Sequence, residues 1–291
     1  MNFLIDPLKN DENYENLIAD IRSKSINNFY IHGMVDKSTG LFSYSLRENL
    51  NRPVFVVFEN EYKAKKAYEA FHMDDSFVFF PELESNTNNI KSLDVEVKSM
   101  RIKTIERLIE GENLLVFASL SALQNKLTNY KQFLSLGLNI NLKTPIEIDD
   151  FSQKLLDLGY EKSYSVESMG QFSVRGGIID IYPVNRDPVR LELFGDEIDS
   201  IRSFEISSQR SIENIDEFKI CPIDEFHIPK DRYLDIGEKI GSEVKNAYKK
   251  GISKDNIDRK FSKILDLLEE KIVINPDLLI PYVDSDVSSI L

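Results

Sequence analysis

The chain has 291 residues, of which 36 are lysine or arginine and 49 are aspartate or glutamate, so its formal net charge is -13. This length allows about two domains with real cores. The negative charge repels the phosphate backbone of DNA unless basic residues cluster, and the sequence has no such cluster. A single cysteine excludes a disulfide framework and a multi-cysteine zinc site. No apolar run approaches the ~18 residues of a membrane span, so we expect a cytoplasmic protein without membrane contact.

The first 130 residues alternate short apolar runs with segments of helical periodicity, which is typical of an α/β layer with a mostly parallel sheet. The predicted strands are 29–32, 54–58, 77–80 and 114–118, and the predicted helices are 38–49, 62–71 and 95–109. Ser119 is placed to cap the short helix that follows.

The sequence pattern changes near Tyr130. One amphipathic helix is predicted at 147–158, and residues 188–206 predict a β-hairpin whose turn is Gly195-Asp196. Further helices are predicted at 234–249 and 257–268. The last residues, SDVSSIL, read as the start of a helix, so we expect the sequence to be part of a longer chain.

Three segments of the second region form a specific pattern: Leu158-Gly159-Tyr160, GQFSVRGGIIDIYP at 170–183 and PVRLELFGDEIDSIRSFEISSQRSI at 188–212. Together they resemble the second domain that the repair helicase UvrB shares with the transcription-repair coupling factors (Mfd). The rest of the chain resembles the N-terminal UvrB-homology module of the coupling factors.

The resemblance implies an α/β fold, in which a degenerate P-loop, helicase-like domain with a parallel sheet carries an inserted small α+β domain. The expected parts are a degenerate helicase-like domain at 1–130, the inserted domain at 131–212, and a mostly helical return to the first domain at 213–291.

The resemblance also implies that the inserted domain binds UvrA and recruits it to stalled RNA polymerase. In the family, ATP-driven DNA translocation and the contacts with RNA polymerase and DNA reside in other, downstream domains. For this region we therefore expect no enzyme activity, no catalytic residue, no metal site and no cofactor, whereas the full-length family member uses ATP and magnesium.

Arg175 matches the arginine of the VRG motif that contacts UvrA in the family, and the expected surface around it comprises Ser173, Gly176, Gly177, Gln171 and Glu161. On this interpretation an arginine at a sheet edge, beside glycines, presents a charged fork and bare backbone to a partner protein. Ser173 and Glu161 stand where UvrB tends to carry basic residues.

The residues alone also allow a simpler interpretation, in which Gly176-Gly177 makes a β-bulge and Arg175 is a solvated strand residue. In either interpretation the alternation of the strand places Phe172 and Val174 on the face opposite Ser173 and Arg175, toward the core.

A phosphate-binding loop would need the pattern G-x-x-x-x-G-K-[ST] after the first strand. If Gly33 is the first glycine, Ser38, Thr39 and Gly40 fall where glycine, lysine and hydroxyl belong. If Lys37-Ser38 is the lysine-hydroxyl pair, Asp36 and Ile31 replace both glycines. We therefore interpret the segment as a degenerate, non-functional nucleotide loop comprising Gly33, Asp36, Lys37, Ser38, Thr39 and Gly40.

The alternative function is a UvrB-like ATPase and DNA damage-verification subunit. Besides the phosphate loop, such a protein needs an aromatic-rich hairpin that inserts between DNA strands. The sequence has a polar stretch at 81–94 in that place.

Overall fold

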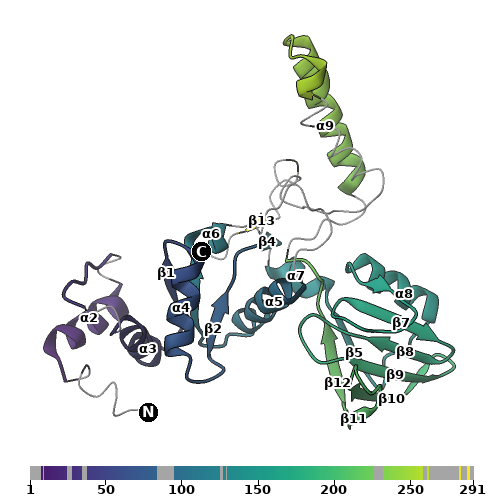
Figure 1. Ribbon diagram of the computed structural model, residues 1–291, viewed down its shortest axis with the longest axis horizontal. Coiled ribbons are helices and arrows are strands. Elements are labelled where there is room, and N and C mark those ends of the chain that lie inside the picture. Colours follow the sequence, from purple (N-terminus) through teal and green to yellow (C-terminus); the bar gives the residue numbers. More distant parts are fainter. Residues whose placement is uncertain are drawn as a thin grey trace. The chain divides into compact units, whose positions relative to one another are not determined.

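The computed structural model describes residues 8, 10–24, 28–34, 38–83, 95–124, 127–128, 130–225, 232–257, 261, 282 and 287–288 (Figure 1). The chain divides into two compact units: residues 1–82 with 103–123, and residues 83–102 with 124–291. Helix α5 (Val95–Ile109) contributes residues to both units. None of the helices in the described ranges has the length and apolar character needed to cross a membrane.

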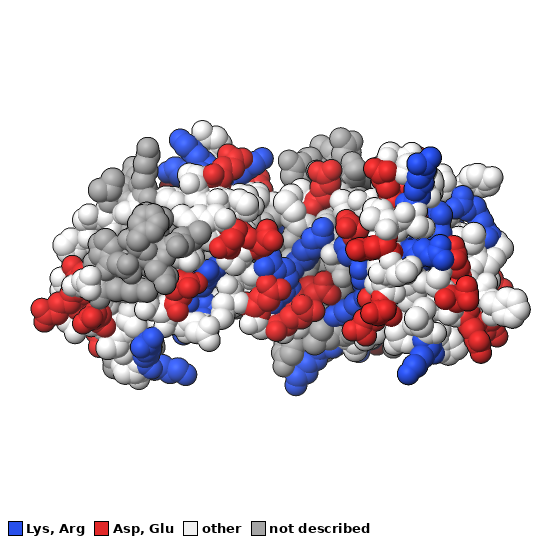
Figure 2. All heavy atoms as spheres, turned by 90° about the horizontal axis from the view of Figure 1, so that it is seen from below, with Lys and Arg blue, Asp and Glu red and all other residues white. Residues whose placement is uncertain are grey.

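Charged side chains of both signs are scattered over the face shown in Figure 2, among residues of other types. Lysines and arginines are interspersed there with aspartates and glutamates rather than gathered into one basic patch. A phosphate backbone would therefore meet carboxylates as well as cations on this face.

The first unit contains a parallel sheet of three described strands in the order β1-β3-β2. These are β1 (Val54–Phe58), β2 (Phe77–Phe80) and β3 (Leu115–Ser119), accompanied by α2 (Glu12–Ser23), α3 (Thr39–Leu50), α4 (Glu61–Phe71) and α6 (Leu120–Gln124). The predicted strands 54–58 and 77–80 are confirmed, and the predicted strand 114–118 is shifted by one residue. The predicted helices 38–49, 62–71 and 95–109 are confirmed to within one residue at each end.

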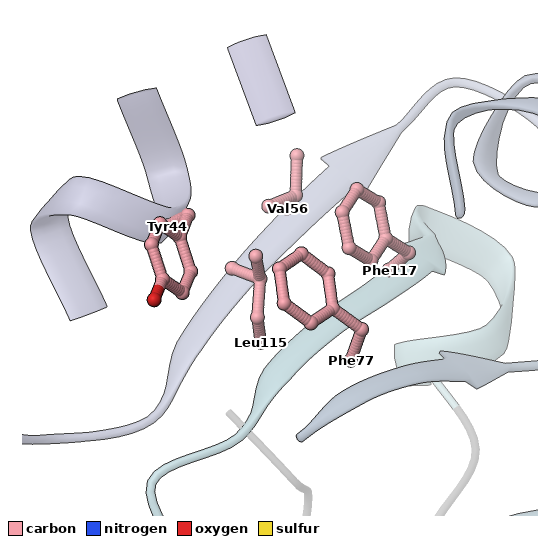
Figure 3. Packing of buried hydrophobic residues seen from close by; sticks show 5 residues of the cluster. All are labelled: Tyr44, Val56, Phe77, Leu115 and Phe117. Carbon is pink, nitrogen blue, oxygen red and sulfur yellow. The ribbon is translucent and has the colours of Figure 1, made fainter. Parts of the chain in front are cut away.

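Five side chains form a core cluster in this unit: Tyr44, Val56, Phe77, Leu115 and Phe117 (Figure 3). The rings of Phe77 and Phe117 stack with their centroids 6.3 Å apart, and Tyr44 from α3 stacks on Phe77 at 5.7 Å. Aromatic pairs of this kind contribute about 0.5–1.5 kcal/mol each beyond their buried area. Aromatic packing between Tyr44 and Phe77 therefore helps to hold α3 against the sheet.

The strand predicted at 29–32 is wrong. Residues 28–32 have no regular secondary structure, and Tyr30 is 91 % exposed. A strand of this kind needs one face buried against a neighbour, and Tyr30 and Ile31 both lie at the surface. Consequently no described strand leads into the segment that begins at Gly33.

The second unit contains a sheet of six described strands in the order β11-β10-β9-β8-β7-β6. Strands β6 and β7 are parallel, and the other neighbours are antiparallel. The strands are β6 (Glu161–Lys162), β7 (Gln171–Arg175), β8 (Ile178–Ile181), β9 (Val189–Phe194), β10 (Glu197–Phe204) and β11 (Ser211–Asn214). The hairpin predicted at 188–206 is confirmed as β9 and β10, with Gly195 at φ +64° in its turn.

The chain enters and leaves this sheet through two strands that pair with each other. Strand β5 (Leu138–Asn141) is antiparallel to β12 (Glu217–Ile220), with Leu138 opposite Ile220. The other elements of the unit are β4 (Leu127–Thr128), α7 (Tyr130–Leu136), α8 (Ile148–Asp157), α9 (Arg232–Lys249) and β13 (Val287–Ser288). The helices predicted at 147–158 and 234–249 are confirmed, whereas most of 257–268 and of the polar stretch 81–94 lies outside the described residues.

Side-chain caps explain where several helices begin. The Oγ of Ser119 accepts a hydrogen bond from the backbone N–H of Ala122 at 3.0 Å, which confirms the predicted cap of α6. The side chain of Asn60 caps α4 in the same way through the N–H of Lys63, and Glu147 caps α8.

Candidate protein-docking site

The segment GQFSVRGGIIDIYP is a β-hairpin rather than one interrupted strand. Arg175 at the end of β7 pairs with Ile178 at the start of β8, which leaves Gly176-Gly177 as a two-residue turn. Gly176 has φ +60°, a conformation that two-residue hairpins require at the first turn position and that glycine adopts without strain. The β-bulge considered from the sequence is therefore wrong for this pair of glycines.

Gly177 has a separate structural role. A Cβ atom at this position would lie 2.8 Å from the carbonyl oxygen of Leu193 on β9. The backbones meet here because the N–H of Leu193 donates a hydrogen bond of 2.7 Å to the carbonyl oxygen of Gly177. The missing side chain thus allows the turn of one hairpin to contact the neighbouring strand.

One face of the six-stranded sheet is polar around this hairpin. Ser173 pairs with Asp180, and Asp180 pairs with Arg190, so the three side chains share a face. Arg175 lies on the same face as Ser173, two residues further along β7. The opposite face carries Phe172, which is fully buried as predicted, and Val174, which is only half-buried.

Asp180 is the centre of this polar face. Its side chain is fully buried, and it accepts hydrogen bonds from two arginines. Nη2 of Arg175 donates to Oδ2 at 2.5 Å, while Nε and Nη2 of Arg190 donate to Oδ1 and Oδ2 at 2.6 and 2.9 Å. Both carboxylate oxygens of a buried charge are therefore satisfied by charge-assisted hydrogen bonds.

Arg190 is the more buried of the two arginines, with its side chain 15 % exposed. Its guanidinium lies over the ring of Phe204, 4.9 Å from the centroid, and also donates to the backbone oxygen of Gln209 at 3.3 Å. The hydrogen bonds to Asp180 raise the pKa of Arg190 above its ordinary value, so this side chain remains charged. Arg190 is therefore the mostly buried positive charge that balances the buried carboxylate of Asp180.

Arg175 differs because its side chain is 41 % exposed. One terminal nitrogen is held by Asp180, and the remainder of the guanidinium lies at the surface beside the glycine turn. The carboxylate partner therefore fixes the position of the arginine without removing it from solvent. Such a group can donate further hydrogen bonds to an acidic group of another molecule.

The other residues expected at this surface are arranged in two ways. Gly176, Gly177 and Glu161 are exposed, and Gln171 is half-buried because its side-chain oxygen accepts hydrogen bonds from the N–H groups of residues 167 and 168. Ser173 is buried, and its Oγ has no hydrogen-bond partner among the described residues. Ser173 therefore does not contribute to the exposed surface that was expected from the sequence.

Sequence reasoning missed Asp180 and Arg190. Their pairing could be inferred only after the hairpin register was known, because Asp180 reaches Arg190 across two strands that are ten residues apart. The Gly-Gly pair between two apolar runs is a hairpin signature that could have supplied the register of β7 with β8, and with it the proximity of Asp180 to Arg175.

The segment interpreted as a degenerate nucleotide loop lies in the first unit. Gly33 has φ +80°, Thr39 and Gly40 lie in α3, Ser38 directly precedes this helix, and Asp36 and Lys37 lie outside the described residues. A Cβ atom on Gly40 would lie 2.2 Å from the ring of Phe71 on α4. Gly40 therefore permits two helices to pack closely. Across the described part of the chain, no group of three or more His, Cys, Asp or Glu side chains could hold a metal ion.

Comparison with known proteins finds a family match over the part of the chain that contains this hairpin. Residues 138–226, which contain β5 to β12, match the family model of the UvrB interaction domain. The chain is 32 % identical over 206 residues to the transcription-repair-coupling factor of Bacillus subtilis (strain 168), which covers 69 % of this chain and 17 % of that protein. The coupling factor of Staphylococcus haemolyticus is 30 % identical over 200 residues, or 68 % of this chain.

The coupling factor of Staphylococcus epidermidis is 33 % identical over 162 residues, which is 55 % of this chain and 14 % of that protein. The chain thus spans about a sixth of the length of the curated relatives that it matches. Residues 138–226 are thus similar to the UvrB interaction domain, and about two thirds of the chain is similar to the transcription-repair-coupling factors.

Proposed function

We propose that this chain binds UvrA through Arg175 and the Gly176-Gly177 turn, and that within a longer coupling factor it recruits UvrA to stalled RNA polymerase. The observation that carries the proposal is the exposed guanidinium of Arg175, which a buried carboxylate holds in place inside the region that matches the UvrB interaction domain. In the longer protein, DNA translocation and the contacts with DNA and RNA polymerase would belong to other domains. The binding of ATP and magnesium would also belong to those domains.

The geometry supports this role because it lowers the cost of binding. A free arginine loses side-chain entropy when it is fixed in an interface. Asp180 already holds one end of the Arg175 side chain, so less freedom remains to be lost. The exposed turn beside it has no side chains, and the backbone of a partner can approach closely there.

We also propose that the first unit descends from a nucleotide-binding, helicase-like domain that no longer hydrolyses ATP. In support, no described strand precedes Gly33, and Gly40 serves to pack α3 against the ring of Phe71. The antiparallel pair β5–β12 supports an inserted domain, because the chain enters and leaves that domain at one place. The three-part division at residues 130 and 212 stays a prediction.

The test is binding of the purified chain to purified UvrA, measured by isothermal titration calorimetry. We choose Arg175→Gln rather than a charge reversal, because a glutamate at 175 would place a second carboxylate next to the buried Asp180 and would destabilise the sheet. The neutral variant is expected to weaken binding at least tenfold, since one charge-assisted contact is worth about 1.5–3 kcal/mol.

A matched control is Arg52→Gln, which removes the same charge from an exposed position in the first unit. It should bind UvrA as the unchanged chain does. Equal binding by a folded Arg175→Gln variant would remove Arg175 from the interface, and no binding by the unchanged chain would refute the proposed function itself.

A further inference from the structure

A buried ion pair outside the proposed UvrA surface joins helix α5 to the segment that leaves the six-stranded sheet. Arg101 of α5 is 1 % exposed, and Glu225, five residues after the end of β12, is 7 % exposed. Nε of Arg101 donates a hydrogen bond to Oε1 of Glu225, and Nη2 donates to Oε2 at 2.9 Å. The guanidinium and the carboxylate therefore meet as two opposed forks, a geometry that fixes direction as well as distance.

The segment that contains Glu225, residues 221–225, is here named the exit segment. On its other side it is held to the elements of the six-stranded sheet. The N–H of Ile223 donates a hydrogen bond of 3.0 Å to the carbonyl oxygen of Leu158, the residue that follows α8. The side chain of Ile223 also lies against Gly170, directly before β7, where a Cβ atom would come within 3.0 Å of it. The exit segment therefore has few alternative positions relative to the sheet.

Two further contacts of α5 surround the ion pair. Lys98 forms a salt bridge of 2.5 Å with Asp224 of the exit segment, and both side chains are partly exposed. The Oγ of Ser99 donates a hydrogen bond of 2.5 Å to the carbonyl oxygen of Val184, which lies in the loop that joins β8 to β9. All four residues belong to the second unit, as the buried ion pair does. Helix α5 thus contacts both the exit segment and the loop between two central strands of the sheet.

Stability alone does not explain charges at this buried contact. Taking a guanidinium and a carboxylate out of water costs about as much as their attraction gains, so apolar side chains of similar volume could stabilise the contact equally well. Apolar burial is non-directional, because it depends on the area removed from water. Two opposed forks, in contrast, are satisfied in one mutual orientation. The charges therefore favour a single arrangement of α5 on the exit segment over others that would bury as much surface.

We infer that Arg101 and Glu225 form an orientation lock, which holds the six-stranded sheet at one fixed angle to α5. The lock acts through the exit segment, because Ile223 attaches this segment to the sheet and Glu225 attaches it to α5. As a consequence, the hairpin that carries Arg175 points in one direction relative to the helix. The lock is the same whatever the hairpin binds, so the inference goes beyond the proposed function and does not rest on it.

The experiment measures orientation and stability separately. Nitroxide labels at Glu96→Cys in α5 and at Asp199→Cys in β10 report the distance between the helix and the sheet by double electron–electron resonance. Both positions are exposed, whereas the native Cys221 is buried, and the chain without introduced cysteines is the labelling control. Urea denaturation of the same chains gives the stability.

The decisive variant replaces both charges, as Arg101→Met with Glu225→Leu. We expect its urea midpoint to stay within about 0.5 M of the unchanged chain, while its distance distribution broadens or gains a second maximum. Glu225→Ala alone leaves a buried guanidinium without its carboxylate and should lower the midpoint by about 1 M or more. The matched control, Lys154→Met with Asp150→Leu, removes an exposed ion pair of α8 and should change neither quantity.

A conservative variant tests the fork itself. Arg101→Lys keeps the positive charge but replaces the planar fork with a point charge, so its distance distribution should also be broader than that of the unchanged chain. If the apolar double variant does not fold, Arg101→Lys decides alone. The same narrow distribution in a folded charge variant as in the unchanged chain would overturn the inference, and so would a broad distribution in the unchanged chain. Loss or retention of UvrA binding changes neither outcome, which keeps this test separate from that of the proposed function.

Discussion

Asp180 and Arg175 are diagonal neighbours across the β7–β8 hairpin, and their side chains meet at 2.5 Å although one is fully buried and the other lies at the surface. The pair therefore links the interior of the sheet to its exposed end. Since Arg190 holds the other side of the same carboxylate, the position of Arg175 depends on a network of three charges.

Removal of the carboxylate should destabilise the second unit. Asp180→Ala leaves the mostly buried Arg190 without its partner, and breaking a buried ion pair in this way costs about 3–5 kcal/mol of unfolding free energy. Urea denaturation checks this value. The control is Asp199→Ala, an exposed aspartate on β10, which should change stability by no more than about 0.5 kcal/mol. Similar small losses for both variants would show that the network does not stabilise the fold.

The two glycines of the turn should respond differently to alanine. Gly177→Ala places a Cβ atom 2.8 Å from a backbone oxygen of Leu193 and should cost about 1–3 kcal/mol of stability. Gly176→Ala meets no neighbouring atom but keeps φ +60°, which costs about 1–2 kcal/mol. Asparagine tolerates this conformation better, so Gly176→Asn should recover part of the loss.

Thermal melting of the three turn variants provides the measurement. If the glycines served only to let a partner approach, Gly177→Ala would weaken UvrA binding and leave the melting temperature unchanged. A lower melting temperature for Gly177→Ala would indicate that this glycine is needed for the stability of the fold, whether or not it also contributes to UvrA binding.

The sequence predicts the buried elements of this protein well. The strands at 54–58 and 77–80 and the helix at 95–109 have the predicted bounds, because continuous apolar runs and a regular helical period leave few alternatives. The run at 29–32 is also rich in strand-forming residues, but its side chains are exposed. A local pattern cannot show whether another segment will bury it.

The candidate site was only partly predictable for a related reason. Arg175 and the glycines stand out in the sequence, and the family resemblance directs attention to them. The pairing of Asp180 with both arginines depends on the register of three strands, and the glycine turn defines only the register of β7 with β8.

Gly40 offers a test of the interpretation of the first unit. An alanine in a helix interior usually gains about 1 kcal/mol over glycine. At this position the added Cβ atom would overlap the ring of Phe71, so we expect Gly40→Ala to lose about 1–3 kcal/mol instead. The double variant with Phe71→Leu, whose smaller side chain can move aside, should recover part of the loss in urea denaturation. A stabilised Gly40→Ala variant would show that α3 and α4 do not pack as closely as described.

Asp74 should make the unfolding free energy of the first unit decrease at acidic pH. Burial alone would raise the pKa of its carboxyl, but hydrogen bonds from the side chain and backbone of Ser76, with the charges of Arg47 and His72, outweigh burial and lower the pKa below its ordinary value of 3.8. Because the folded state binds the proton less readily than the unfolded state, the stabilisation is present above the ordinary pKa and is lost as pH falls below it.

The measurement compares the unfolding free energy at about pH 5 and about pH 3. The unchanged chain should lose more stability over this interval than Asp74→Asn, because asparagine keeps the acceptor oxygen for Ser76 and does not titrate. Asp75→Asn removes a neighbouring exposed carboxylate and serves as the control. Equal losses in the unchanged chain and in Asp74→Asn would mean that the carboxylate at 74 does not contribute to the acid sensitivity of the fold.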